Sequence, residues 1–163
     1  MIDLDKFKLS ATGKAKENKK FLMGLSKVRD NVLDDAFHET HEEVFSEIDC
    51  LQCANCCKTT SPIFYPVDID RLSKHLRMKP GEFIEKYLRI DEDNDYVLKS
   101  SPCPFLGDDN YCGVYDSRPK ACREYPHTDR KKMSQVLDLT FKNTKVCPAV
   151  LEMVERLKRE FKV

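Results

Sequence analysis

The residues of this chain whose type and spacing could do chemistry are its eight cysteines, four of which stand close together at Cys50, Cys53, Cys56 and Cys57. Thiolates at a C-x2-C spacing can bind one metal ion or cluster, because two intervening residues let the loop turn until both sulfurs converge. Cys56 and Cys57 are adjacent, so their side chains leave the backbone in diverging directions, and we expect one of them to face a second site. The spacing therefore predicts a thiolate-bound metal centre.

Four more cysteines lie downstream, which gives enough thiols for two four-thiolate sites. Ferredoxin sequences combine a C-x2-C-x2-C triplet with a further cysteine that precedes proline. Here Cys103-Pro104 and Cys147-Pro148 could each supply that remote ligand, and the second site would take Cys57 with the remaining cysteines. One site with spare thiols stays open as an alternative. The predicted metal ligands are Cys50, Cys53, Cys56, Cys57, Cys103, Cys112, Cys122 and Cys147.

Four thiolates suit both zinc and iron–sulfur clusters, so the ligand type alone does not separate the two. A zinc ribbon would show a second C-x2-C pair, whereas the downstream cysteines are 9, 10 and 25 residues apart. The C-x3-C-x2-C arrangement of radical enzymes is also missing, because the position three after Cys57 is Thr60. The pattern favours an iron–sulfur cluster such as 4Fe-4S and keeps zinc as the alternative.

Basic residues surround one of the downstream cysteines. A four-thiolate site around a divalent ion or a 2+ cluster carries a net charge of about −2, which neighbouring groups must offset. Arg118, Lys120 and Arg123 flank Cys122 and are expected to do this, the alternative being a pocket for an anionic substrate. His127 follows soon after and could replace a thiolate or relay a proton.

Composition and charge limit the class of protein. The chain has 163 residues, with 28 basic and 28 acidic side chains, which argues against a surface built to hold nucleic acid. Its first residues are threaded with charges and do not resemble a signal peptide, and no apolar run is long enough to span a membrane. We therefore expect a cytoplasmic location, where thiols serve as metal ligands more often than as a disulfide framework.

The elements that must position the cysteines follow from apolar spacing and from proline. The predicted fold class is mainly α with irregular cysteine-rich loops and a short β-hairpin. Residues 1–47 form a charged helical lead-in, 48–147 a cysteine-cluster metal-binding core, and 148–163 a C-terminal helix packed on the core, in one domain overall. The predicted elements are one or two helices over Lys14–Glu47 with a break near His38–His41, helices over Val67–Leu76, after Pro80 and from Pro148, and strands over Tyr96–Lys99 and within Met133–Lys142.

The cysteine run and the downstream motifs together resemble the CxxCxxCC cysteine-cluster family, known as a zinc- or iron-chelating domain. The resemblance covers about Cys50 to Cys147 and implies one or two cysteine-ligated zinc or iron centres. A lysine methylase related to this family carries a similar cysteine set. The matching motifs are Cys50-x2-Cys53-x2-Cys56-Cys57, Cys103-Pro104-Phe105-Leu106, Cys112-Gly113-Val114-Tyr115, Arg118-Pro119-x2-Cys122-Arg123-x-Tyr125-Pro126 and Cys147-Pro148.

Three functions are consistent with these observations. The first is a cytoplasmic metal-binding protein, with an iron–sulfur cluster favoured over zinc. The second is a zinc-stabilised interaction module, in which the charged N-terminal helices recruit a protein partner. The third is an enzyme that modifies a protein side chain, for which the sequence offers no catalytic residue. Neither a membrane nor a nucleic acid is an expected partner.

Overall fold

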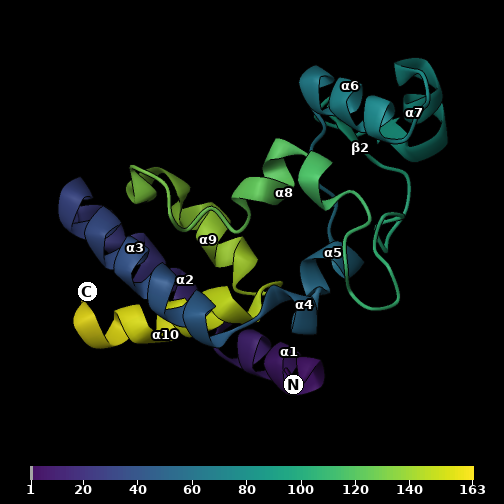
Figure 1. The fold of residues 1–163 in the computed structure, drawn as a ribbon. Coiled ribbons are helices and arrows are strands. Elements are labelled where there is room, and N and C mark those ends of the chain that lie inside the picture. The colour runs from purple at the N-terminus through teal and green to yellow at the C-terminus, as the bar shows by residue number, and fades with distance from the viewer. Residues whose placement is uncertain (1) are drawn as a thin grey trace. The chain divides into compact units, whose positions relative to one another are not determined.

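The computed structural model describes residues 2–163 and is mainly helical, with ten α-helices and one two-stranded antiparallel sheet in that part of the chain (Figure 1). This confirms the predicted fold class. The chain divides into two compact units. Unit 1 consists of the residues up to Cys53 together with Pro126–Val163, and unit 2 is the continuous segment Ala54–Tyr125 inserted between them.

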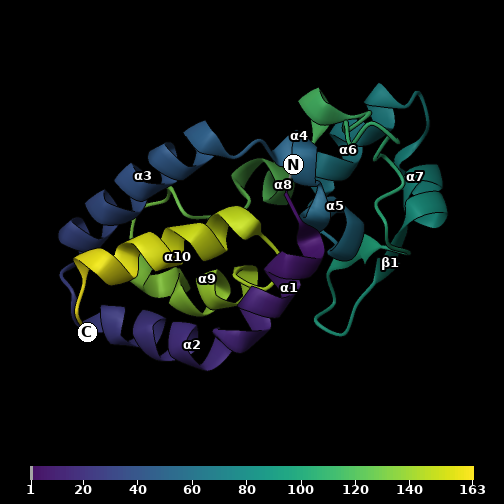
Figure 2. The same cartoon turned by 90° about the horizontal axis from the view of Figure 1, so that it is seen from below.

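Unit 1 is a helical bundle in which α10 packs against α3, and α2 packs against α9 (Figure 2). Its apolar core includes Leu22, Phe37 and Leu157, all with no exposed surface. The C-terminal helix begins at Pro148 as predicted, since proline lacks the N–H that the first turn leaves unpaired. The elements of unit 1 are α1 (Leu4–Gly13), α2 (Ala15–Gly24), η1 (Leu25–Lys27), α3 (Asp30–Glu47), α4 (Cys50–Cys53), η3 (Met133–Val136), α9 (Leu137–Asn143) and α10 (Pro148–Glu160).

Two helices over Lys14–Glu47 are confirmed, but the predicted break near His38–His41 is wrong. Helix α3 runs through this stretch without interruption, and the break lies at η1 and the residues after it. Phe37, Thr40 and Val44 are buried at successive helical turns, so the apolar face continues past the histidines. Thr40 fits this face because its hydroxyl donates to the Ala36 carbonyl 2.7 Å away.

The strand predicted within Met133–Lys142 is also wrong, because this segment forms η3 and α9. The buried residues Leu137, Thr140 and Thr144 are three and four positions apart, which is the period of a helix face. The apolar residue Leu139 falls outside that face and is 38% exposed. The strand was predicted from an apparent alternation of apolar residues, which in fact belong to a short helix. These residues are Val136, Leu137, Leu139 and Phe141.

Unit 2 has its own core, built from aromatic and aliphatic side chains. Phe83 is fully buried, and its ring is stacked on Phe105 with the centroids 6.2 Å apart. The predicted helices and the predicted strand are confirmed, and the strand pairs in the register Leu88↔Leu98 across a polar turn. The elements of unit 2 are α5 (Asn55–Thr59), α6 (Pro66–His75), α7 (Pro80–Tyr87), β1 (Leu88–Ile90), β2 (Tyr96–Leu98), η2 (Tyr115–Ser117) and α8 (Lys120–Glu124).

None of the helices formed by residues 2–163 is both long enough and apolar enough to cross a membrane.

Candidate metal centre

The cysteine run begins in α4 and continues in α5, and Ala54 separates the two helices. Ala54 has a φ of 48°, in the left-handed region that a residue with a β-carbon rarely adopts. The boundary between the two units falls just before it, so Cys50 and Cys53 belong to unit 1, whereas Cys56 and Cys57 belong to unit 2. The eight cysteines are therefore divided between two units.

Unit 2 brings Cys57 together with Cys103 by a direct link between the two chain segments. The Cys103 backbone N–H donates to the Cys57 carbonyl at 2.8 Å. Cys57 lies on the short helix α5 and Cys103 in the loop that follows β2, so this bond joins segments that are distant in sequence. It establishes Cys103, rather than Cys147, as the neighbour of Cys57 within this unit.

Cys112 is held near Cys103 by a narrow loop. Leu106 and Cys112 form an isolated antiparallel bridge, and the Gly113 N–H donates to the Phe105 carbonyl at 2.8 Å. The Gly107 N–H closes the loop by donating to the Tyr111 carbonyl at 2.8 Å. A methyl group on Gly107 would come within 2.7 Å of an Asp109 carboxylate oxygen, so a larger side chain would disturb this turn.

The thiols of Cys57, Cys103, Cys112 and Cys122 are close enough to affect each other's ionisation. Burial raises the pKa of Cys122 to about 12, and the neighbouring charges of Cys57, Cys103 and Cys112 raise it further. Burial is also the main reason that the pKa values of Cys103 and Cys112 are raised. Four thiols that raise one another's pKa values lose their protons to solvent most readily when a cation binds all of them.

Cys57 differs from the other three thiols of this group. A hydrogen bond from Cys56 lowers the pKa of Cys57 to about 7 against the opposing effect of burial, with Arg118 and Lys58 adding to the lowering. The thiolate is the form that binds metal. Cys57 is therefore the thiol of unit 2 that is best prepared to make the first bond to an incoming ion.

Arg118 provides positive charge to the same group. Its guanidinium lies 3.7 Å from the centre of the Tyr115 ring, and its Nε donates to the Tyr115 carbonyl at 2.9 Å. From this position it lowers the pKa values of Cys57, Cys112 and Cys122, although other causes are larger. Of the two readings of this arginine, the surroundings support charge compensation for the thiolates.

Unit 1 brings together Cys147, Cys50 and Cys53. Burial raises the pKa of Cys147 to about 11, and the charges of Cys50 and Cys53 raise it further. Cys147 is the N-cap of α10, and its backbone N–H donates to the Asn143 carbonyl at 2.8 Å. Each unit thus contains one of the two cysteines that precede proline, which separates the two pairings that the sequence left open.

The residues present suit a soft metal. In both groups the donors are sulfur atoms, which favour zinc and iron–sulfur clusters over magnesium or calcium. Among residues 2–163, no three Cys, His, Asp or Glu side chains already stand in a metal-ligand arrangement. The structure gathers the thiols, and the assignment of all eight as ligands stays a prediction.

The other candidate residues are positioned as follows. Lys120 forms an ion pair with Glu124 at 3.7 Å, and Arg123 is exposed on the same helix, α8. His127 belongs to unit 1 and has a φ of 63°. His38 and His41 bond to the segment after it, through the Arg130 carbonyl and the Thr128 hydroxyl, each at 2.8 Å.

Two residues that matter for this site were missed by the sequence reasoning. Asp68 and Arg71 on α6 form an ion pair of 2.7 Å, and both bond to the backbone of the segment that leads into α8 and Cys122. Their only sequence signal is an acidic residue three positions after Tyr65, where it can accept from the N-cap backbone of a helix that begins at Pro66.

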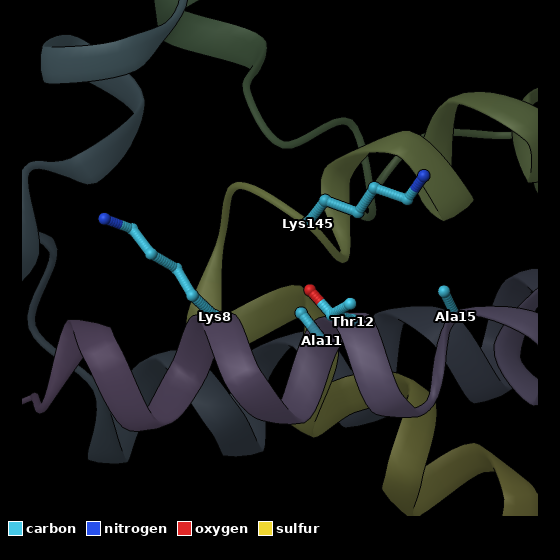
Figure 3. A pocket seen from close by; sticks show the side chains of 5 residues that line it. All are labelled: Lys8, Ala11, Thr12, Ala15 and Lys145. Carbon is cyan, nitrogen blue, oxygen red and sulfur yellow. The ribbon is translucent and has the colours of Figure 1, made fainter.

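A shallow hollow of about 210 Å³ on unit 1 is separate from the thiols of Cys50, Cys53 and Cys147, none of which lines it. It is lined by Lys8, Ala11, Thr12, Ala15 and Lys145. Figure 3 shows the amines of Lys8 and Lys145 pointing in opposite directions, so they do not converge on one ligand. The Lys145 amine instead lies 4.8 Å from the centre of the Phe141 ring.

The comparison with protein families agrees with the cysteine pattern. The model of the CxxCxxCC family, described as a "putative zinc- or iron-chelating domain", matches residues 49–148. This is more than half of the chain, and the chain belongs to that family. The match ends one residue after Cys147 and includes all eight cysteines. No curated protein and no solved structure matches the chain.

Proposed function

We propose that this protein holds two cysteine-ligated metal centres and that the centre in unit 2 is an iron–sulfur cluster. Its ligands would be Cys57, Cys103, Cys112 and Cys122. The observation that carries the proposal is the linkage of these cysteines within unit 2, where the Cys103 N–H donates to the Cys57 carbonyl at 2.8 Å and the Leu106–Cys112 bridge closes the next loop. The mutual effect of the four thiols on one another's ionisation agrees with this. Four thiolates beside one compensating cation would suit a cluster whose net charge is negative.

The second centre would lie in unit 1, with Cys50, Cys53 and Cys147 as ligands. Their proximity supports this assignment, since the charges of Cys50 and Cys53 raise the pKa of Cys147. Cys56 stays a predicted ligand on its sequence spacing alone. The expectation that the side chains of Cys56 and Cys57 diverge toward different sites is wrong, because the Cys56 side chain hydrogen-bonds to that of Cys57 and both residues belong to unit 2.

When bound, an iron–sulfur cluster supplies one-electron redox chemistry at a potential set by its net charge, hydrogen bonds and exposure to water. The residues of this chain would adjust that potential. Burial around Cys103 and Cys122 limits access of water, and Arg118 offsets negative charge. We place such a protein in the reducing cytoplasm, where exposed thiols persist.

The experiment that tests this proposal is metal analysis with an absorption spectrum, on protein purified without oxygen from its own kind of cell. Iron with acid-labile sulfide and a broad absorption band near about 400 nm is the expected result. Stoichiometric zinc in a colourless protein would overturn the iron–sulfur assignment. Absence of both metals would overturn metal binding altogether.

A colourless zinc protein would support a second function, an interaction module. The observation that favours it is the exposed lysines of α1 and α2, namely Lys6, Lys8, Lys16, Lys19 and Lys20. In that case we would expect an acidic protein partner to bind these helices, with an affinity that falls as the salt concentration rises.

A further inference from the structure

Asp68 is a fully buried carboxylate in unit 2 that accepts hydrogen bonds from three donors. Its Oδ2 accepts from the Tyr65 N–H at 3.0 Å, which closes the start of α6. Its Oδ1 accepts from an Arg71 guanidinium nitrogen at 2.7 Å and from the Lys120 N–H at 3.1 Å. Lys120 is the first residue of α8, so a carboxylate on one helix satisfies the backbone at the start of another.

Arg71 continues the link from α6 to the same segment. One of its terminal nitrogens donates to the Arg118 carbonyl at 2.7 Å, and its Nε donates to the Ser117 carbonyl at 3.3 Å. The planar fork of an arginine can direct several N–H groups at fixed angles, which a lysine cannot do. Asp68 and Arg71 together therefore bind three backbone groups of one short segment, at Ser117, Arg118 and Lys120.

The segment that they fix carries two groups of the candidate metal centre. Arg118 is bonded through its own carbonyl, and its guanidinium lies over the Tyr115 ring, close enough to act electrostatically on Cys112. Cys122 follows on α8, and its N–H donates to the Pro119 carbonyl at 3.0 Å. A shift of this backbone would move the compensating charge and a thiol at the same time.

Stability alone is a weak explanation for the pair. Replacing a buried ion pair with apolar residues is often neutral or stabilising, because desolvation of the charges offsets their attraction. What apolar residues could not reproduce is the set of directed bonds to three backbone groups. The ion pair therefore serves to hold the backbone of Ser117–Lys120 in one conformation.

We infer that Asp68 and Arg71 are positioning residues of the unit 2 metal centre, which hold Arg118 and Cys122 in the arrangement that binds metal. This inference rests on the proposed function, since it requires a metal at Cys57, Cys103, Cys112 and Cys122. The residues act through the Ser117–Lys120 backbone and touch no metal themselves. Residues that orient ligands in this way typically contribute a factor of about 10–100 to metal affinity.

The test is a chelator competition on the full-length, metal-loaded chain, comparing Arg71→Lys with the unchanged protein. The phase of metal release that is absent in Cys122→Ser identifies the unit 2 centre. Arg71→Lys keeps the charge beside Asp68 but loses the fork, and we expect it to weaken metal retention at that centre about 10–100-fold. Arg89→Lys is the matched control, because Arg89 is exposed on β1 in the same unit.

A double-variant comparison separates positioning from general destabilisation. If Arg71 acts by placing Arg118, the combination of Arg71→Lys with Arg118→Gln should weaken metal retention less than the product of the two single effects. Helix content measured by circular dichroism shows whether each variant is folded. Independent, fully multiplying effects in folded protein would overturn the inference, as would wild-type retention in Arg71→Lys.

The outcomes also distinguish this inference from the proposed function. An unchanged protein that binds no metal removes both. An unchanged protein that binds metal at unit 2, with an Arg71→Lys variant indistinguishable from Arg89→Lys, removes the positioning role and leaves the metal centre in place.

Discussion

His41 is a residue whose surroundings disfavour its charged form. Burial lowers the pKa of His41 from its ordinary value of 6.5, while the nearby charge of Asp129 partly opposes this effect. Its ring nitrogen Nδ1 lies 2.8 Å from the Thr128 hydroxyl, and its ring centre lies 4.5 Å from that of Phe45. The histidine therefore helps to hold the 127–132 segment against α3 as a neutral group.

This environment predicts a pH dependence of stability. Just below pH 6.5 the unfolded chain binds a proton at His41 more readily than the folded protein does. The free energy of unfolding therefore falls as the pH decreases through this range, and the effect levels off below the lowered pKa of the folded protein. His41→Gln should show a shallower fall between pH 7 and about pH 5.5 in urea denaturation. Equal slopes in the two proteins would contradict the prediction.

The sequence identified the cysteines but could not assign them to groups. Spacing brought Cys50 and Cys53 together, because a two-residue gap has few ways to close. The two cysteines that precede proline were equivalent in sequence, and they differ only through contacts between distant segments, such as the bond from the Cys103 N–H to the Cys57 carbonyl. Asp68 escaped notice for the same reason, since the Lys120 N–H that donates to it lies 52 positions away.

Among the elements, α10 is the helix whose apolar side is most clearly required. Leu157 has no exposed surface, and α10 packs against α3. Helix α10 also carries Arg156, which forms ion pairs with Glu47 at 2.6 Å and with Glu152 at 2.9 Å. Exposed ion pairs of this kind typically contribute between zero and about 1 kcal/mol, so burial of apolar side chains is what holds the helix.

Leu157→Ala should therefore lower the free energy of unfolding by about 2–5 kcal/mol, because it removes buried atoms and leaves a cavity in the core of unit 1. Leu9→Ala is the matched control. Leu9 is 77% exposed on α1, and its truncation should change stability by less than about 0.5 kcal/mol. Chemical denaturation of the two variants checks the prediction. Similar losses of unfolding free energy in both would show that α10 does not pack against α3 as described.

The helices and strands were predicted correctly where the local sequence signal was strong. Proline at a first helical position marked the starts of α7 and α10, and in both cases the structure agrees. The errors came where the segment with regularly spaced apolar residues was short. In Met133–Asn143 a few apolar residues fit either period, and only their contact with α2 and α3 decides that the segment is helical.

At the scale of the whole molecule, the two units would give the two proposed metal centres separate surroundings. Each unit has its own apolar cluster, around Phe37 and Leu157 in one and around Phe83 in the other. The free energy of metal binding stabilises the loops that supply the ligands. We therefore expect loss of one centre to loosen mainly the unit that contains it.

Hydrogen exchange on Cys122→Ser tests this expectation. Amide exchange should speed up about tenfold or more within residues 54–125, while the protection of α3 and α10 is kept, because their core contains none of the affected ligands. Cys147→Ser is the reciprocal variant and should loosen unit 1. Equal loss of protection in both units after either substitution would mean that they unfold as one.

The insertion of unit 2 also fixes an order in which the protein can be completed during synthesis. Glu47 and Arg156 are 109 positions apart, so nearly the whole chain is made before α3 can pack against its partner helix. Ala54–Tyr125 is compact and has its own apolar cluster, so it can fold while the ribosome is still translating the rest. Once closed, it shortens the effective loop between α3 and α10, which lowers the entropy cost of joining them. The nascent chain can thus complete unit 2 before unit 1, whose sequence flanks it on both sides.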